Sequence, residues 1–272
     1  MRLCIGLCLL LAGNVIPSSD DEILISDVWY DIIYKHSDEQ IARERERCKN
    51  SEVLKDDLAS AFTMDVYIWD EEIPLYKEKF GIADDTLRTA LMGIYEKVQH
   101  VGKDPFSSDD PEEVTDDKRR LHYALEWLGY CADKSTKEFL KKVATDKTID
   151  RVFRNQAIRA YLRNATAKEF DWVTSLLADK SQNTSSIYSM SIEEYARADS
   201  DTKRRKAIAS VLSAALAKEE DKYIFNYLDK DFAKLDKDYA NSPQRRAALQ
   251  RLDLPLPPDP PKEEKKPWWK IR

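Results

Sequence analysis

DDKRRLHYALEWLGYCADKSTKEFLKKVATDKTIDRVFRNQAIRAYLRN, residues 116–164, is the stretch of sequence that decides the fold. Its apolar residues recur three and four positions apart, as Leu121, Leu125 and Leu128 do. This spacing places them on one face of an α-helix. Short polar segments interrupt the pattern twice, so the stretch predicts three amphipathic helices joined by two turns.

One type of helix start occurs twice in this region. Ser135–Glu138 and Thr166–Glu169 both fit a capping box, and a Phe follows each of them. In such a box the Ser or Thr and the Glu side chains accept hydrogen bonds from amides that the first helical turn leaves free. A capped start that recurs with the same apolar anchor is typical of stacked helix pairs. We therefore expect residues 116–252 to form a helical repeat domain.

An acid or cap followed by Arg and then Ala also recurs along this domain. The pairs of cap and Arg are Asp116 with Arg120, Asp150 with Arg154, Asp201 with Arg204, and Ser242 with Arg245. Arg in a first helical turn is unfavourable for the helix dipole, so its repetition needs a reason. Either each Arg pairs with an Asp in a turn between repeats, or the Arg side chains line a face for an anionic partner. We favour the first, structural interpretation.

This order of elements resembles that of HEAT-repeat proteins. The residues that carry the resemblance are Ala124–Gly129, Asp133, Phe139–Leu140, Asp146 and Arg154–Ala157. They follow the family's order of a first helix, an Asp, a second helix, an Asp-containing turn and an Arg-x-x-Ala helix, and the match is best over residues 116–179. The resemblance implies an all-α fold, an α-α superhelix of helical hairpins, and a protein-binding role without catalytic residues.

The segments around the repeats have their own compositions. Residues 20–101 follow a helical pattern, and residues 102–115 contain prolines, serines and acids that predict a loop between this N-terminal section and the repeats. Residues 182–199 interrupt the repeat spacing and predict an insertion with one extra helix. Residues 253–272 contain six prolines and predict an extended tail.

The N-terminus has the order of a secretory signal peptide: one Arg, an apolar run and then small polar residues. We expect residues 1–19 to direct export to the periplasm or the extracellular space, with a buried N-terminal helix as the alternative. The apolar run is shorter than the about 20 residues that span a bilayer. In an exported chain Cys48 and Cys131 could form a disulfide, although Cys131 also fits an apolar helical stripe as a buried thiol.

No residue pattern indicates catalysis, a metal ion or a cofactor. The three histidines, His36, His100 and His122, form no spaced ligand pair, and no serine-nucleophile motif is present. Six glycines include no phosphate-binding loop, and the net charge of −6 argues against nucleic-acid binding. We therefore expect a protein without enzyme activity, cofactor or small-molecule substrate.

The tail carries the candidate partner-binding residues. Trp268 and Trp269 are costly to expose to water, and Lys270 and Arg272 lie beside them. They could dock on the protein's own surface, meet a partner or contact a membrane. The sequence thus predicts an exported scaffold, or a module that binds proteins or peptides. Alternatives are a helical hydrolase or its accessory subunit with an acidic groove, and an envelope structural protein anchored by its tail.

Overall fold

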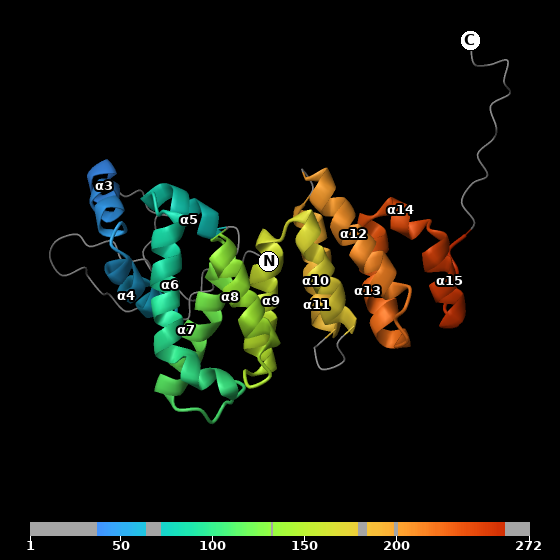
Figure 1. Ribbon diagram of the computed structural model, residues 1–272, viewed down its shortest axis with the longest axis horizontal. Helices are drawn as coiled ribbons and strands as arrows, with labels where there is room; N and C mark the ends of the chain where they lie inside the picture. Colours follow the sequence, from blue (N-terminus) through green and yellow to red (C-terminus); the bar gives the residue numbers. More distant parts are fainter. Residues whose placement is uncertain (1–36, 64–71, 132, 179–183, 199–200, 259–272) are drawn as a thin grey trace, which may run out of the picture. The chain divides into compact units, whose positions relative to one another are not determined.

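The computed structural model is entirely helical in the part of the chain that it describes (Figure 1). That part comprises residues 37–63, 72–131, 133–178, 184–198 and 201–258. It contains thirteen α-helices, α3 to α15, and two short 3-10 helices, η2 and η3, and no strand occurs within these ranges. The all-α fold class is therefore confirmed. The expected signal peptide and the four candidate residues of the tail lie outside the described residues.

The chain divides into two compact units, and the first ends at Cys131. Its helices are α3 (Asp38–Arg47), α4 (Ser51–Ala61), α5 (Glu72–Phe80), α6 (Asp84–Val98) and α7 (Glu112–Leu128), with η2 (Gln99–Lys103) after α6. Buried aromatic rings fill the centre of this unit. The ring centroid of Trp127 lies 5.4 Å from that of Phe62 and 5.7 Å from that of Tyr76.

These contacts move the domain boundary away from the place that the sequence predicted. We expected residues 102–115 to separate the N-terminal section from the repeats, but α7 packs on α6 and belongs to the first unit. The predicted loop was also too long, because α7 already begins at Glu112. Asp116 and Arg120 therefore lie inside a helix and not at its start.

The second unit contains the remaining helices. They are α8 (Lys134–Thr145), α9 (Arg151–Asn164), η3 (Ala167–Glu169), α10 (Phe170–Ala178), α11 (Thr184–Arg197), α12 (Thr202–Leu216), α13 (Lys222–Leu235), α14 (Lys237–Ala240) and α15 (Pro243–Arg251). The extra helix predicted within residues 182–199 is present as α11.

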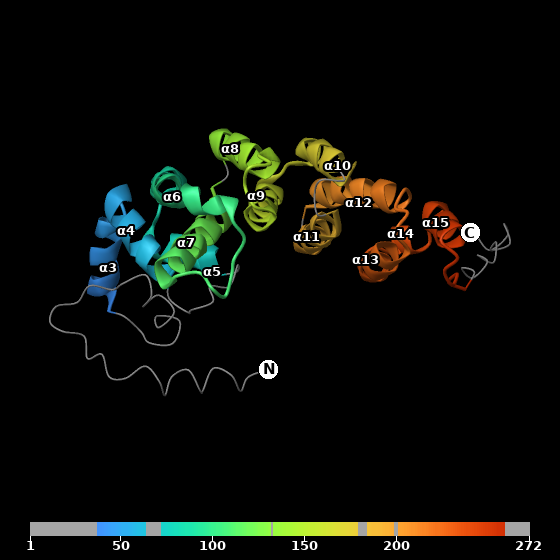
Figure 2. The same cartoon turned by 90° about the horizontal axis from the view of Figure 1, so that it is seen from below.

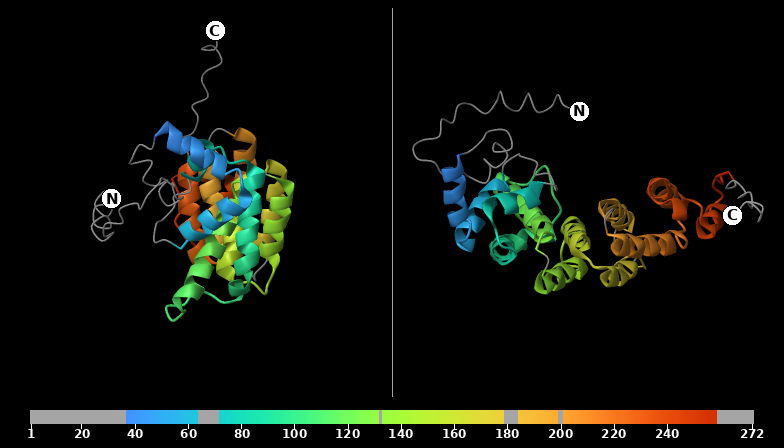
Figure 3. Two further views of the ribbon diagram at one scale, coloured as in Figure 1. Left: turned by 90° about the vertical axis from the view of Figure 1, so that its left-hand side faces the viewer. Right: turned by 90° about the horizontal axis from the view of Figure 1, so that it is seen from above.

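Helices that contact one another in this unit are often not consecutive in sequence. α8 and α9 form a hairpin, α9 packs on α11 and α11 on α13, while α10 packs on α12 and α12 on α15. Figure 2 shows α10 and α12 in a layer above α11 and α13, and the view from above separates the same two layers (Figure 3). The two layers enclose the apolar core of the unit.

One of the two predicted capping boxes is present. Thr166 and Glu169 form a capping box at the start of η3, and the Thr166 amide donates to the Glu169 carboxylate at 2.6 Å. The box predicted at Ser135 is wrong. Asp133 caps α8 instead, accepting the Thr136 amide at 2.9 Å, and the Ser135 hydroxyl donates to the same carboxylate. An acid two residues upstream therefore took the role assigned to Ser135.

The two cysteines that the structure describes, Cys48 and Cys131, are buried, and no disulfide joins them. Burial raises the pKa of the Cys48 thiol to about 11. A thiol that holds its proton so firmly is a poor nucleophile at neutral pH. Cys48 and Cys131 therefore act as small core residues.

Candidate functional site

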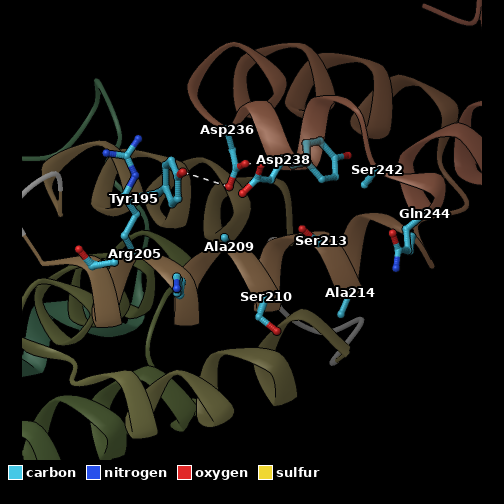
Figure 4. A pocket seen from close by; sticks show the side chains of 14 residues that line it. Tyr195, Arg205, Ala209, Ser210, Ser213, Ala214, Asp236, Asp238, Ser242 and Gln244 are labelled. Carbon is cyan, nitrogen blue, oxygen red and sulfur yellow. Dashed lines mark hydrogen bonds between the residues drawn. The ribbon is translucent and has the colours of Figure 1, made fainter. Parts of the chain in front are cut away.

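A groove of about 780 Å³ runs along α12 in the second unit (Figure 4). We call it the α12 groove. Its floor is one face of α12 and includes Arg205, Lys206, Ala209, Ser210, Ser213 and Ala214. Its opposite wall comes from the start of α14 and the start of α15 and includes Asp236, Asp238, Tyr239, Ser242 and Gln244. In Figure 4, Arg205 lies at one end of the groove and Gln244 at the other.

The groove is open because the two faces of α12 differ in side-chain size. Ile208, Leu212 and Leu216 are fully buried, and α12 packs on α10 and α11. The floor of the groove carries Ala and Ser side chains, such as Ala209 and Ser213. These side chains are too short to fill the space to the opposite wall, so a groove remains between them.

A buried ion pair holds the wall in place. The Asp229 carboxylate is 2% exposed and accepts from Arg245 Nε at 2.7 Å and from Arg245 Nη2 at 2.8 Å. It also accepts from the Tyr239 hydroxyl at 2.9 Å, and Arg245 Nη1 donates to the Ala240 carbonyl at 2.9 Å. We call these residues the Asp229 network. It joins α13, α14 and α15 through charge-assisted bonds, which are the strong ones in proteins.

The Asp229 network also perturbs the tyrosine within it. Burial raises the pKa of Tyr239 far above its ordinary value, and the nearby Asp229 charge raises the pKa further. Tyr239 therefore stays neutral and keeps donating its hydroxyl proton to the carboxylate. This hydrogen bond therefore persists over the whole neutral range of pH.

Tyr195 and Arg205 form the cationic end of the groove. The Tyr195 hydroxyl donates to Asp236 Oδ2 at 3.0 Å, and the Arg205 guanidinium lies 4.4 Å from the centre of the Tyr195 ring. Asp236 also caps α14, because its Oδ1 accepts the Tyr239 amide at 2.9 Å. Burial raises the pKa of Tyr195. This end thus has fixed geometry, with Lys206 exposed beside it.

Five further polar side chains of the lining have no partner within the described ranges. Among the residues that the structure describes, none makes a hydrogen bond or ion pair with the side chains of Lys206, Ser210, Ser213, Asp238 or Gln244. Together they supply donors, acceptors and both signs of charge along one groove. Such a mixed lining suits a ligand that itself carries both donors and acceptors, as a peptide backbone does.

The first of the predicted Asp and Arg pairs does not form a contact. Arg120 Nη1 donates to Asp117 at 2.7 Å, and Arg120 Nε donates to the Ala59 carbonyl at 3.0 Å. Asp116 lies 3.7 Å from Arg119. Arg120 therefore pairs with an Asp of its own helix and not with one in a turn between repeats.

The next pair is also split. Asp150 caps α9 by accepting the Val152 amide at 2.8 Å, while Arg154 Nε donates to the Ile149 carbonyl at 3.1 Å. Arg154 is 9% exposed. It does not form part of a face that an anionic partner could cover.

In α12 and α15 the Arg residues do connect neighbouring helices. Arg204 donates to Glu194 of α11 at 2.6 Å and to the Leu162 and Arg163 carbonyls at the end of α9, at 2.8 and 3.1 Å. The Leu162 carbonyl also accepts the Ala165 amide at the C-cap of α9, at 3.1 Å, so Arg204 adds a side-chain donor at this helix end. Asp201 caps α12 and accepts the Arg204 amide. Arg245 contacts Asp229, as described above. The acids involved therefore lie within helices and not in the predicted turns.

Comparisons of this chain with protein-family models, with curated proteins and with solved structures found no match. Two further searches concern the described residues. No helix there is both long enough and apolar enough to cross a bilayer. No group of His, Cys, Asp or Glu in the same residues is arranged to hold a metal ion.

Proposed function

We propose that this protein is an exported α-solenoid of the HEAT-repeat type, which binds a protein partner by holding one extended segment of it in the α12 groove and catalyses no reaction. The two contacting layers of the second unit, with α9, α11 and α13 in one and α10, α12 and α15 in the other, support the solenoid. The apolar run that begins the sequence supports export.

The observation that carries this proposal is the unused polar lining in front of a rigid wall. From Arg205 to Ala214 the floor of the groove covers about 14 Å, at about 1.5 Å per helical residue. An extended peptide covers that length with about four residues, at about 3.3 Å each. Four residues carry several backbone donors and acceptors, and Ser210, Ser213 and Gln244 offer both kinds of partner. The Asp229 network keeps the wall ordered before binding, which lowers the entropic cost of association.

The charges of the groove favour an acidic side chain in that segment. Lys206 is exposed and has no acidic partner among the described residues, and the Arg205 guanidinium lies at the same end. A carboxylate there would form a charge-assisted contact. We therefore assign the ligand class as an extended peptide segment with an acidic residue.

The same geometry disfavours the hydrolase alternative. Of the two carboxylates that line the groove, Asp236 already accepts from the Tyr195 hydroxyl and the Tyr239 amide, so its oxygens serve the fold. Asp238 remains as one exposed carboxylate. General acid–base catalysis by paired carboxylates needs two that face the same substrate bond. Anchoring of an envelope protein by its tail concerns residues outside the described part.

Peptide selection tests the proposal. The full chain is exposed to a displayed library of random peptides, and the enriched sequences are expected to contain acidic residues. Their binding should fall at least about tenfold in Ser213→Arg, which fills the groove. It should fall about fivefold in Lys206→Glu, because an exposed charge contact is worth up to about 1 kcal/mol. Lys230→Glu on the exposed face of α13 is the matched charge control. Equal binding by Lys206→Glu and Lys230→Glu, or no enrichment at all, would sink the proposal.

A further inference from the structure

We infer that this chain's own segment 259–264 occupies the α12 groove within the same molecule, with Glu263 and Glu264 against Lys206. The contact itself is supported by the path of the chain after α15, by the length of the segment and by its charges. Its consequence, that the segment competes with a partner, rests on the proposed peptide binding. The proposal concerns the occupant of the groove before a partner arrives.

The described chain leads toward the groove. After α15 it reverses direction: Asp253 has φ 51°, and the Leu254 amide donates to the Leu249 carbonyl at 2.9 Å. This is a Schellman arrangement, in which a residue in the left-handed region ends a helix. The following residues run back along α15, where Arg246 Nη2 donates to the Pro258 carbonyl at 3.0 Å. The described chain therefore ends, at Pro258, beside the first turn of α15.

That first turn is also the end of the groove. Gln244 lines the groove and Arg246 holds Pro258, and both belong to the first turn of α15. Positions two apart on a helix point to different sides, so Pro258 and the groove are separated by no more than the width of one helix, about 10–12 Å with side chains. To enter the groove, the segment needs to cross from one side of α15 to the other.

The length of the segment fits this path. Pro260 and Pro261 favour a polyproline II conformation, which rises about 3.1 Å per residue. Glu264 is the sixth residue after Pro258 and so reaches about 19 Å. Lys206 lies about 12 Å along α12 from Ala214, which faces Gln244 across the groove, at about 1.5 Å per residue. The remaining distance is within the combined length of a Lys and a Glu side chain.

The charges match in the order that this path imposes. The segment reads Asp-Pro-Pro-Lys-Glu-Glu from 259 to 264. Entering past Gln244, it first brings Lys262 to Asp238, and then Glu263 and Glu264 to Lys206. A polyproline II segment makes no internal hydrogen bonds, so its carbonyls are free for Ser210 and Ser213. Trp268 and Trp269 follow this stretch in the sequence and are not part of the proposed contact.

Tethering decides between this occupant and a second copy. Contacts of exposed charges are weak, about 1 kcal/mol or less each. A tether of a few residues supplies an effective concentration in the millimolar range, far above that of a second molecule in solution. We therefore commit to the intramolecular contact.

Hydrogen exchange of the full chain tests it. In the wild type the amides of Lys262, Glu263 and Glu264 should exchange about fivefold more slowly than in Lys206→Glu, because the charge contact is worth about 1 kcal/mol. The triple variant Lys206→Glu with Glu263→Lys and Glu264→Lys should recover the protection. Lys230→Glu is the matched control and should leave the protection unchanged.

Three results would overturn the inference. Equal exchange in the wild type and in Lys206→Glu would remove the contact, and so would a triple variant that stays unprotected. Protection that rises with protein concentration would assign the groove to a second copy. The proposed function fails separately: if the segment is protected but Glu263→Lys with Glu264→Lys still captures no peptide, the groove serves the chain alone. Peptide capture without any protection of the segment sinks the inference and leaves the proposed function standing.

Discussion

In the wall of the α12 groove, Asp229 accepts three hydrogen bonds from protein groups, whereas Ser210 on the floor has no partner among the described residues. The Asp229 network behind the wall is withdrawn from water, so each polar group in the network costs several kcal/mol unless it is paired. The floor stays in water, where an unpaired hydroxyl costs nothing. The Asp229 network therefore stabilises the fold, whereas the unpaired polar groups of the lining are left for a ligand. Substitutions in these two groups of residues should have separate effects on stability and on binding.

Asp229→Ala should give the largest effect. It leaves the Arg245 guanidinium and the Tyr239 hydroxyl buried without their acceptor, and breaking a buried ion pair costs about 3–5 kcal/mol. Chemical denaturation measures the change in the free energy of unfolding. Asp231→Ala on the same helix is the control, because Asp231 forms a surface pair with Lys234 at 2.9 Å, and such pairs are worth about 1 kcal/mol at most. Equal losses of unfolding free energy in the two variants would show that the buried Asp229 network contributes no more to stability than a surface ion pair does.

Alkaline pH should weaken the wall next. Burial raises the pKa of Tyr239 and of Tyr195 above the ordinary value of 10.0. The unfolded chain therefore releases these protons before the folded chain does. The stabilisation is fully present below about pH 10 and is lost as the pH rises above it, by up to about 1.4 kcal/mol per pH unit for each tyrosine.

Denaturation curves between about pH 8 and about pH 11 measure this slope. Tyr239→Phe is the matched variant: it is less stable at pH 8 because it lacks the hydrogen bond to Asp229, but its stability should fall less steeply above pH 10. Parallel slopes for the wild type and Tyr239→Phe would show that Tyr239 ionises as easily in the folded wall as in the unfolded chain. In that case water would reach the Tyr239 hydroxyl in the folded protein.

Tyr195→Phe should have a smaller effect. It removes the hydrogen bond to Asp236, which is worth about 1 kcal/mol, and keeps the ring that lies under Arg205. Unfolding should therefore become easier by about that amount, and capture of the selected acidic peptides should persist. If peptide capture were abolished while stability stayed the same, the Tyr195 hydroxyl would serve the ligand and not the fold.

Helical periodicity predicted most of the architecture, because an amphipathic stripe follows directly from the order of residues. Leu121, Leu125 and Leu128 of α7 are all fully buried, as their spacing indicated. The partners of that stripe were not predictable in the same way. Composition suggested that the loop before α7 divides the chain, yet the rings of Phe62 and Trp127 join α7 to the first unit. Which helix a stripe packs on depends on contacts far apart in sequence.

The site illustrates the same limit with single residues. The recurring Arg residues were visible in the sequence, but the partner of Arg245 lies on α13 and that of Arg204 on α11. Proximity in sequence pointed to Asp201, which caps its own helix instead. The groove did leave a signal in the sequence. Ala209, Ser210, Ser213 and Ala214 recur on the face of α12 opposite its large apolar residues, where a core helix would carry larger side chains.

Ser210→Ala should give the smallest change in stability and the clearest separation of the two roles. Ala is a slightly better helix former than Ser, by up to about 0.5 kcal/mol, and the Ser210 hydroxyl bonds to no described residue. The free energy of unfolding should therefore stay the same or rise slightly.

Binding of the selected peptides to Ser210→Ala should fall two- to fivefold, since one neutral hydrogen bond is worth about 0.5–1 kcal/mol. Denaturation and peptide titration of the same preparation measure both quantities, with Ser175→Ala on α10 as the control for binding. A loss of more than about 1 kcal/mol of stability in Ser210→Ala would mean that the floor holds the fold together as the wall does. The groove would then be a structural gap, and its unpaired groups would carry no argument for a ligand.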